Sequence, residues 1–255
     1  MTVVFVHAHP DDEAIFTGGT MVRLAATGVQ VVLVIATGGE LGTVRPGHGG
    51  DDAVDLAAVR RAECAAAAAH LDVVRVEHLG YHDSGMAGDA ANDAAGAFCR
   101  VDVDAAAAGL ASILTAVGAT AVVGYDDDGI YGHPDHVQVT RVVRAAAAIA
   151  GVATVYGATV DREYLHFVES HVVAEAGLVD DLGLVRSRIG VATVEVAVTV
   201  DVRDVLAAKR AAIGAHASQI PESSSVLQLP DDHFADVYGW EWFVRWGPPG
   251  PFELL

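Results

Sequence analysis

Residues 3–36, VVFVHAHPDDEAIFTGGTMVRLAATGVQVVLVIA, contain the pattern that decides the fold. Val3–Val6 is a short apolar run that predicts a strand. Glu13–Thr27 has the composition of a helix, and Gly28 is placed to end it. Val29–Ala36 is almost continuously apolar, which is typical of a parallel strand covered on both faces. The stretch is therefore predicted to form a β-α-β unit.

The same alternation of strands and helices continues to residue 160. Further helices are expected at Leu56–His70, Asp104–Ala116 and Asp135–Ala150, and further strands at Val73–His78, Ala119–Gly124 and Ala153–Val160. This order predicts an α/β fold that is Rossmann-like, with a mainly parallel sheet and helices on both faces. We expect one domain over residues 1–255, with a core at 1–160 and a C-terminal elaboration at 161–255.

The last third of the chain follows a different pattern. Val191–Val202 alternates and is rich in β-branched residues, so it predicts an edge strand or a hairpin. Beyond Pro221 the sequence predicts irregular structure. Residues 247–251, GPPGP, predict an extended arm that is free or packed on a neighbouring subunit. The tryptophans are expected either to pack in a core or subunit contact or to form the wall of a sugar pocket: Trp240, Trp242 and Trp246.

Composition narrows the class of function. Lys plus Arg number 15 and Asp plus Glu number 34, so the net charge is −19. Such a charge repels phosphate backbones and anionic lipid, so we expect no nucleic-acid partner and no membrane partner. The two cysteines, Cys64 and Cys99, are too few for a disulfide scaffold. The sequence predicts a cytoplasmic protein, and a homo-oligomer is compatible with it.

Two similar motifs each follow a predicted strand. HPDDE at residues 9–13 comes after Val3–Val6, and HPDH at residues 133–136 comes after Ala119–Gly124. Each motif taken alone is compatible with an ordinary helix start, because Pro and Asp are favoured there. However, ligands of open α/β sheets bind beyond the carboxyl ends of the strands. We therefore expect the two motifs to meet in one crevice.

The residue types in these motifs predict metal-assisted hydrolysis. His9, Asp12 and His136 are suited to be the three protein ligands of a catalytic zinc, which leaves a fourth position for water. Fe²⁺ or Co²⁺ suits the same ligands. Asp11 is placed to act as a general base. We expect His133, as an imidazolium, to stabilise negative charge on a carbonyl oxygen.

Three segments of the sequence resemble a known family. HAHPDDEAIFTGGT at residues 7–20, DSGM at 83–86 and YGHPDH at 131–136 are similar to segments of the PIG-L/LmbE-like zinc N-deacetylases. The pattern is closest to the mycothiol-pathway branch, which contains N-acetylglucosaminyl deacetylases and conjugate amidases. The resemblance implies a hydrolase that removes an acetyl or larger acyl group from an N-acylated amino sugar or sugar-bearing small molecule.

The resemblance also implies one Zn²⁺ per chain and a role for nine residues. They are His9, Asp12 and His136 as metal ligands, Asp11 as general base, His133 and Tyr131 as groups that stabilise the transition state, and Arg60, Asp83 and Met86 as substrate contacts. The three substrate contacts have ordinary alternatives: an exposed helix arginine, a turn aspartate and a packing methionine.

One departure from the family leaves the substrate open. The mycothiol branch tends to have the pattern G-E-x-G-E, whereas residues 39–43 are GELGT and lack the second acid. The substrate is therefore expected to be an N-acyl amino sugar, a thiol conjugate cleaved by a mycothiol-type amidase, or a natural product trimmed by a tailoring deacetylase. The loops at 36–55 and 80–100 are expected to determine which of these substrates is bound. A non-catalytic Rossmann-like protein that binds a nucleotide is the alternative from another class.

Overall fold

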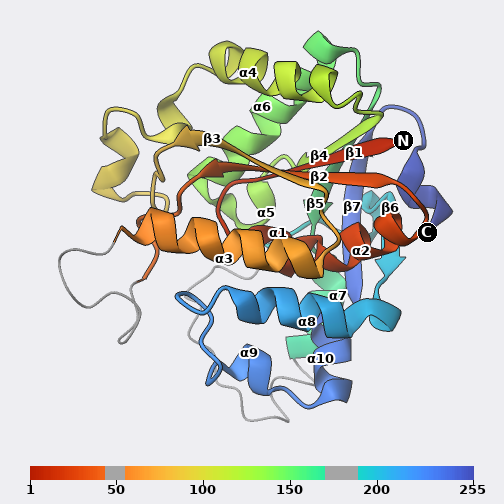
Figure 1. The fold of residues 1–255 in the computed structure, drawn as a ribbon. Helices are drawn as coiled ribbons and strands as arrows, with labels where there is room; N and C mark the ends of the chain where they lie inside the picture. Colours follow the sequence, from red (N-terminus) through yellow and green to blue (C-terminus); the bar gives the residue numbers. More distant parts are fainter. Residues whose placement is uncertain (44–54, 170–188) are drawn as a thin grey trace.

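A seven-stranded sheet runs through the middle of the molecule (Figure 1). It is seen in a computed structural model that describes residues 1–43, 55–169 and 189–255. The strand order is β3-β2-β1-β4-β5-β7-β6. The strands are β1 Thr2–His7, β2 Gln30–Thr37, β3 Arg75–Tyr81, β4 Ala121–Tyr125, β5 Thr154–Thr159, β6 Val198–Asp201 and β7 Trp240–Trp246.

The first five strands are parallel, which confirms the predicted α/β fold class. Val4 of β1 pairs with Val32 of β2 on one side and with Val122 of β4 on the other. These residues are nearly or completely inaccessible to water, as expected for central strands covered on both faces. β1 therefore lies at the centre of the parallel part of the sheet.

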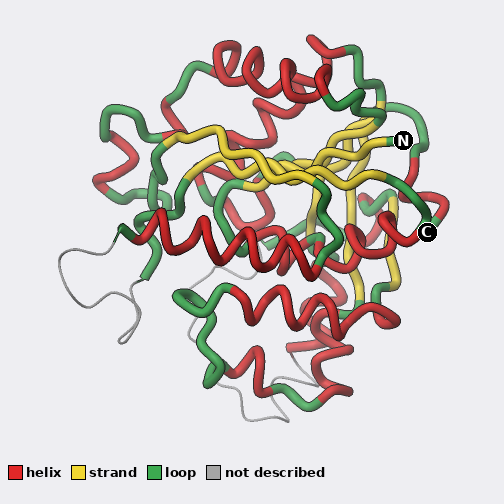
Figure 2. The backbone as a smooth tube through the Cα atoms, viewed as in Figure 1, coloured by secondary structure: helices red, strands yellow, loops and turns green. Residues whose placement is uncertain are grey.

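Helices cover both faces of the sheet (Figures 1 and 2). On one face α4 packs against α6, and on the other α3 packs with α8 in an outer position. The longer helices are α3 Leu56–His70, α4 Val103–Ala116, α6 Pro134–Ala150 and α8 Leu206–Ala215. The predicted helix Leu56–His70 has the observed bounds, and the other two predicted core helices agree within one residue.

The predicted helix Glu13–Thr27 is instead two helices, α1 Asp12–Phe16 and α2 Gly18–Ala26. The break lies at Thr17, whose φ of −140° is not helical. The cause is a distant carboxylate: Glu241 of β7 accepts hydrogen bonds from the backbone N–H groups of Gly19 and Thr20, both at 2.8 Å. These are free N–H groups of a helix start, so α2 begins beside Glu241.

The C-terminal third joins the same sheet. Its edge strand β6, within Val191–Val202, is as predicted. The residues beyond Pro221 are more regular than the sequence predicts, because they form α9 Ser225–Gln228, α10 Asp231–Tyr238 and strand β7. β7 runs antiparallel between β5 and β6. Its sequence, WEWFVRW, is apolar on the face of Trp240, Trp242, Val244 and Trp246. On the other face Phe243 stands between Glu241 and Arg245, so the alternation that marks a half-buried strand is interrupted.

The end of the chain packs on its own sheet, which corrects the expectation of a free or intersubunit arm. Phe252 is 1% exposed, and its ring stacks on that of Tyr156 with centroids 4.0 Å apart. Phe5 and Phe243 lie against the same ring of Phe252. The Gly- and Pro-rich residues 247–251 thus lead an aromatic side chain into the core.

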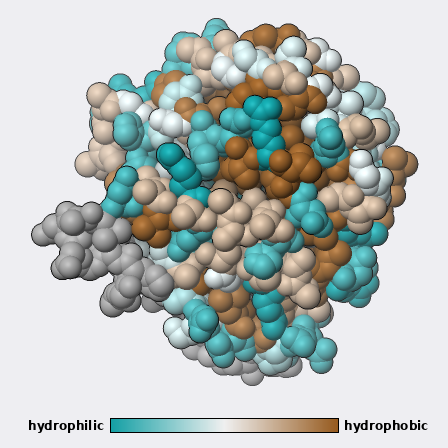
Figure 3. Space-filling view, viewed as in Figure 1, coloured by the Kyte–Doolittle hydropathy of each residue, from teal (hydrophilic) through white to brown (hydrophobic). Residues whose placement is uncertain are grey.

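The surface view shows hydrophobic residues gathered at the open sheet edge between the two helical layers (Figure 3). Val74, just before the edge strand β3, is 63% exposed. Among the described residues, no helix combines the length and the apolar character needed to cross a bilayer.

A buried ion pair joins α8 to β7. Lys209 Nζ lies 2.7 Å from Glu241 Oε1, and both side chains are 1% exposed. Glu241→Gln leaves the ammonium group buried without its counter-charge, so we expect the free energy of unfolding to fall by about 3–5 kcal/mol. Urea unfolding measures this change. In the control Asp127→Asn, which breaks an exposed pair with Arg144, the loss should be under about 1 kcal/mol. Equal losses of unfolding free energy in the two variants would show that the buried Lys209–Glu241 pair stabilises the fold no more than an exposed pair does.

Candidate active site

The two predicted motifs meet at the carboxyl ends of β1 and β4. β1 ends at His7, two residues before His9, and β4 ends at Tyr125, before the short helix α5 Gly129–Gly132 and then α6. Because β1 and β4 are parallel neighbours, the residues that follow them lie at the same edge of the sheet. α6 begins at Pro134, with His133 as its N-cap residue.

The three predicted metal ligands are in contact. Asp12 Oδ2 lies 3.3 Å from His9 Nδ1 and 3.3 Å from His136 Nε2. All three residues are buried. Burial acts to raise the pKa of Asp12, but the adjacent His136 and His9 rings hold it well below its usual range. Asp12 is therefore a carboxylate, ready to bind a cation.

Further donor atoms surround His9. One ring nitrogen from each of His9, His133 and His136 lies within 4.8 Å of the other two. One potential ligand atom from each of His9, Asp83 and Asp135 meets the same limit. His9 Nε2 faces Asp135 Oδ2 at 3.2 Å, which leaves Nδ1 on the side of Asp12.

The residues present fit a divalent metal. Asp12 Oδ2 faces a ring nitrogen of each histidine, Nδ1 of His9 and Nε2 of His136. Two imidazoles and one carboxylate also form a donor set that suits zinc or iron. The cluster is therefore a metal-capable centre.

Asp11, the predicted general base, has an unusual backbone conformation. Its φ is +115°, in a region that L-residues rarely adopt. Glu13 Oε2 accepts a hydrogen bond from the Asp11 N–H at 2.9 Å, and Arg60 Nη2 lies 3.1 Å from Asp11 Oδ2. Burial raises the pKa of Asp11 to about 6, although the Arg60 charge acts in the opposite direction. The carboxylate is thus held by Arg60, at the residue that precedes the predicted ligand Asp12.

Arg60 is buried rather than exposed on its helix. It is 4% exposed, and it donates hydrogen bonds to the carbonyl oxygens of Pro10 and Gly39, the latter at 2.6 Å. Together with the ion pair to Asp11, these bonds connect α3 to the segments that follow β1 and β2. Its described contacts are therefore with the protein, and its contact with a substrate stays a prediction.

His133 and Tyr131 lie beside the candidate ligands. The His133 ring is 4.6 Å from that of His9 between centroids, and the Tyr131 hydroxyl is 3.5 Å from His136 Nε2. Burial, together with the charges of His9 and His136, lowers the pKa of His133 to about 4. Both effects disfavour the expected imidazolium, and the role of His133 in stabilising negative charge stays a prediction. Its Nδ1 accepts the backbone N–H of Asp135, so its proton is on Nε2.

The other two predicted substrate contacts differ in position. Asp83 is 8% exposed, and its Oδ1 lies 3.6 Å from His9 Nε2. Met86 is 44% exposed, and its backbone N–H donates to Asp89. Of the loop expected to decide substrate choice, residues 44–54 lie outside the described residues.

A family model described as PIG-L, GlcNAc-PI de-N-acetylase, matches residues 4–147. The chain belongs to the PIG-L family. A 1D-myo-inositol 2-acetamido-2-deoxy-alpha-D-glucopyranoside deacetylase from Salinispora arenicola is 38% identical over an alignment that covers 98% of this chain and 86% of the relative. The resemblance found in the sequence is confirmed, and so is the prediction of an enzyme that hydrolyses an amide.

Solved structures share the fold of this PIG-L chain. A deacetylase from the teicoplanin biosynthesis pathway, in complex with teicoplanin, has a TM-score of 0.64 at 19% identity and covers 98% of this chain and 100% of that one. A 4-carboxy-2-hydroxymuconate hydratase from Pseudomonas putida KT2440 has a TM-score of 0.63 at 18% identity, with 98% of both chains covered. Since a deacetylase and a hydratase have nearly the same TM-score to this chain, the structural similarity shows the fold alone.

Sequence reasoning missed several residues that support the PIG-L centre. Asp135 is completely buried and accepts hydrogen bonds from the backbone and the hydroxyl of Ser84 as well as facing His9. His216 Nε2 lies 2.7 Å from Glu13 Oε1, and both side chains are fully buried. The sequence did offer a sign that Asp135 belongs to the site, because it lies between the predicted site residues His133 and His136. The segment AHASQI at residues 215–220, which resembles the family, pointed to a role of His216 near the site. Its pairing with Glu13 had no signal, since the two residues are distant in the chain.

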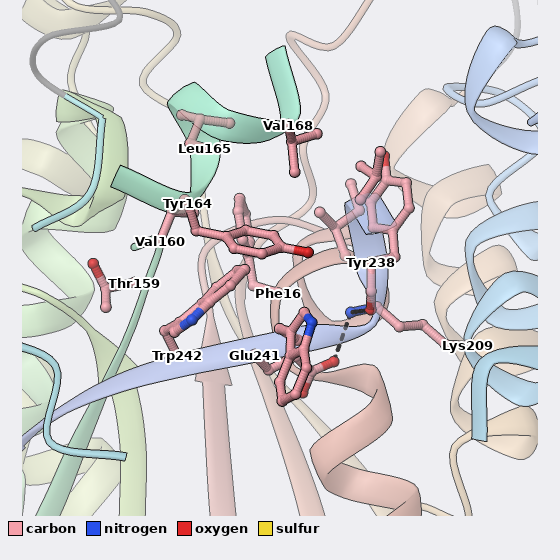
Figure 4. A pocket seen from close by; sticks show the side chains of 13 residues that line it. Phe16, Thr159, Val160, Tyr164, Leu165, Val168, Lys209, Tyr238, Glu241 and Trp242 are labelled. Atoms are coloured by element: carbon pink, nitrogen blue, oxygen red, sulfur yellow. Dashed lines mark hydrogen bonds and ion pairs between the residues drawn. The ribbon is translucent and has the colours of Figure 1, made fainter. Parts of the chain in front are cut away.

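An apolar pocket of about 140 Å³ lies next to the centre (Figure 4). Tyr164 and Trp242 line it, with ring centroids 5.2 Å apart. Phe16 separates the pocket from the centre, because it lines the pocket and its ring centroid is also 6.4 Å from that of His136. None of the nine predicted site residues lines this pocket. Trp240 and Trp242 thus border a space behind Phe16 rather than the cluster around His9.

The buried Arg60 predicts a stability effect. Lys has no planar fork with which to bind two carbonyl oxygens and a carboxylate together. We therefore expect Arg60→Lys to lower the free energy of unfolding by about 1.5–3 kcal/mol. Arg61, the next residue of α3, is exposed, and Arg61→Lys is the matched control, with a change within about 0.5 kcal/mol. Chemical unfolding of both variants measures the difference, and indistinguishable midpoints would refute a supporting role for Arg60.

Proposed function

We propose that this chain removes an acetyl, or a larger acyl group, from the nitrogen of an amino sugar with the help of one bound zinc ion. The observation that carries the proposal is the contact of Asp12 with both His9 and His136 in one buried cluster. Asp11 precedes Asp12 in the sequence and pairs with Arg60. This cluster contains the ligand types of a catalytic zinc site together with a separate carboxylate. Fe²⁺ in place of Zn²⁺ fits the same donors.

In this proposal His9, Asp12 and His136 hold the metal. A metal at this position lowers the pKa of water and polarises the amide carbonyl. Asp11 is the general base that takes a proton from the attacking water. Its ion pair with Arg60 and the bond from its own N–H to Glu13 fix the conformation of its side chain and backbone.

Two neutral donors are available for the carbonyl oxygen. His133 carries its proton on Nε2, because its Nδ1 accepts the N–H of Asp135. Burial raises the pKa of Tyr131 far above its usual value, so its hydroxyl keeps its proton at pH 7. We propose that these two groups donate hydrogen bonds to the oxygen as negative charge develops on it. After attack, the proton held by Asp11 goes to the leaving amine.

The proposed substrate is an N-acetylglucosaminyl compound. The support is the 38% identity to the Salinispora deacetylase over 98% of this chain. We propose that three residues contact the sugar: Asp83, Met86 and Arg60. Asp83 lies beside His9. A larger amide conjugate or a glycosylated natural product needs the same centre, so substrate assays must separate these cases.

The metal proposal is tested by metal content. We expect about one zinc or iron ion per chain in untagged protein. Removal by a chelator should abolish acetate release from N-acetylglucosaminyl-inositol, and added zinc should restore it. His136→Ala should lose the ion because it removes one of three ligands. Wild-type protein that binds no metal after zinc addition, but binds nucleotides, would refute the proposal and favour a non-catalytic binding protein.

The role of Asp11 is tested by Asp11→Asn. An amide of the same size retains the shape but cannot accept the proton, so we expect kcat to fall about 10²–10⁴-fold. Metal content should remain that of the wild type, because Asp11 is not a proposed ligand. Acetate release and metal analysis on the same preparation measure both. Turnover close to the wild-type value would show that another group is the base.

A further inference from the structure

A chain of buried hydrogen bonds leads to the carboxylate of Asp12. Thr17 Oγ1 lies 2.8 Å from His7 Nε2, and His7 Nδ1 lies 3.1 Å from the hydroxyl of Tyr125. The Tyr125 hydroxyl in turn donates to Asp12 Oδ2 at 2.9 Å. His7, Thr17 and Tyr125 are completely buried, and none of them has a part in the mechanism proposed above.

The number of available protons determines which group donates in each of these hydrogen bonds. A tyrosine hydroxyl has one proton to donate and two lone pairs that accept. The proton of Tyr125 goes to Asp12, because an ionised carboxylate can only accept. The N–H of Ala8 donates to one lone pair at 2.9 Å. The other lone pair faces His7 Nδ1, which must therefore carry a proton and donate it. His7 Nε2 then accepts the Thr17 hydroxyl at 2.8 Å, a shorter contact than the 3.2 Å from the same hydroxyl to the carbonyl oxygen of Glu13.

Tyr125 touches a second proposed metal ligand through its ring. The rings of Tyr125 and His136 are stacked, with centroids 4.2 Å apart and an angle of 9° between their planes. The hydroxyl thus orients the Asp12 carboxylate while the ring supports the His136 imidazole. The backbone N–H of His9 is the other donor to Asp12 Oδ2, at 2.9 Å. Two donors on one oxygen restrict how the carboxylate can turn.

We propose that Tyr125, oriented by His7, is a positioning residue that sets the affinity of the centre for its metal. The inference rests on the metal centre of the proposed function. Hydrogen bonds to a ligating carboxylate fix its orientation, and their loss typically weakens metal binding 10- to 100-fold. Each bond in the row also polarises the next, so the Tyr125 hydroxyl is a stronger donor when His7 donates to it.

Tyr125→Phe tests the inference, because it removes the hydroxyl and keeps the ring that stacks on His136. Tyr156→Phe is the matched control. Tyr156 is also fully buried, on the neighbouring strand β5, and its hydroxyl donates to the carboxylate of Glu253 at 2.5 Å. The readout is the zinc dissociation constant, measured by competition with a chromogenic chelator at fixed pH. We expect it to rise about 10- to 100-fold in Tyr125→Phe and to be unchanged in Tyr156→Phe.

Equal zinc affinity in Tyr125→Phe and the wild type would overturn the inference while the proposed function stands. Wild-type protein without zinc affinity would overturn both. If Tyr125→Phe does not fold, nitrogen NMR of ¹⁵N-histidine-labelled wild type decides, with the His7 signals assigned through His7→Gln. A proton on Nδ1 of His7 supports the hydrogen-bond direction. A His7 ring with its proton on Nε2 alone would refute it.

Discussion

The parallel pairing of β1 with β4 is the constraint on which the centre depends. Val3, Val4 and Phe5 are in register with Ala121, Val122 and Val123. This register places the two segments that follow the strands side by side, so that His9 and His136 approach the same carboxylate. A slip of one residue would exchange the faces of one strand and carry its motif away from the other. The apolar, β-branched residues of the strands therefore determine the geometry of the polar cluster.

The second requirement is that the carboxylates at this edge are buried with partners. Asp12 and Asp135 contact imidazoles, Asp11 pairs with Arg60, and Glu13 pairs with His216. A buried charge without such a partner is strongly unfavourable. Several partners come from outside the two motifs. The C-terminal third supplies His216 to α1, and its Lys209–Glu241 pair binds the start of α2, so this part of the chain supports the segment that contains the HPDDE motif.

The sequence alone could predict what depends on local pattern. The strands, the core helices and the two motifs follow from apolar runs and from residue types at strand ends. The break at Thr17 could not be predicted, because its cause is the carboxylate of Glu241 on another strand. The protonation of His133 likewise depends on burial and on neighbouring rings. The contacts of Arg60 join three segments that only the folded sheet brings together. These three features could not be predicted because each depends on contacts between residues that are far apart in the sequence.

The strained residues of the fold show how those long-range partners serve the centre. Asp11, with φ +115°, and Ile130, with φ +66°, are two of three non-glycine residues with positive φ in the described structure, and each lies close to one of the motifs. Such conformations cost free energy and persist only where surrounding groups hold them. Buried carboxylates do so in both cases, since Glu13 accepts the N–H of Asp11 and Asp126 accepts that of Ile130 at 2.7 Å. Thr159 of β5 donates to Asp126, and His216 pairs with Glu13. The two turns that lead into the motifs are therefore held by residues from outside the motifs, Thr159 of β5 and His216, which follows α8.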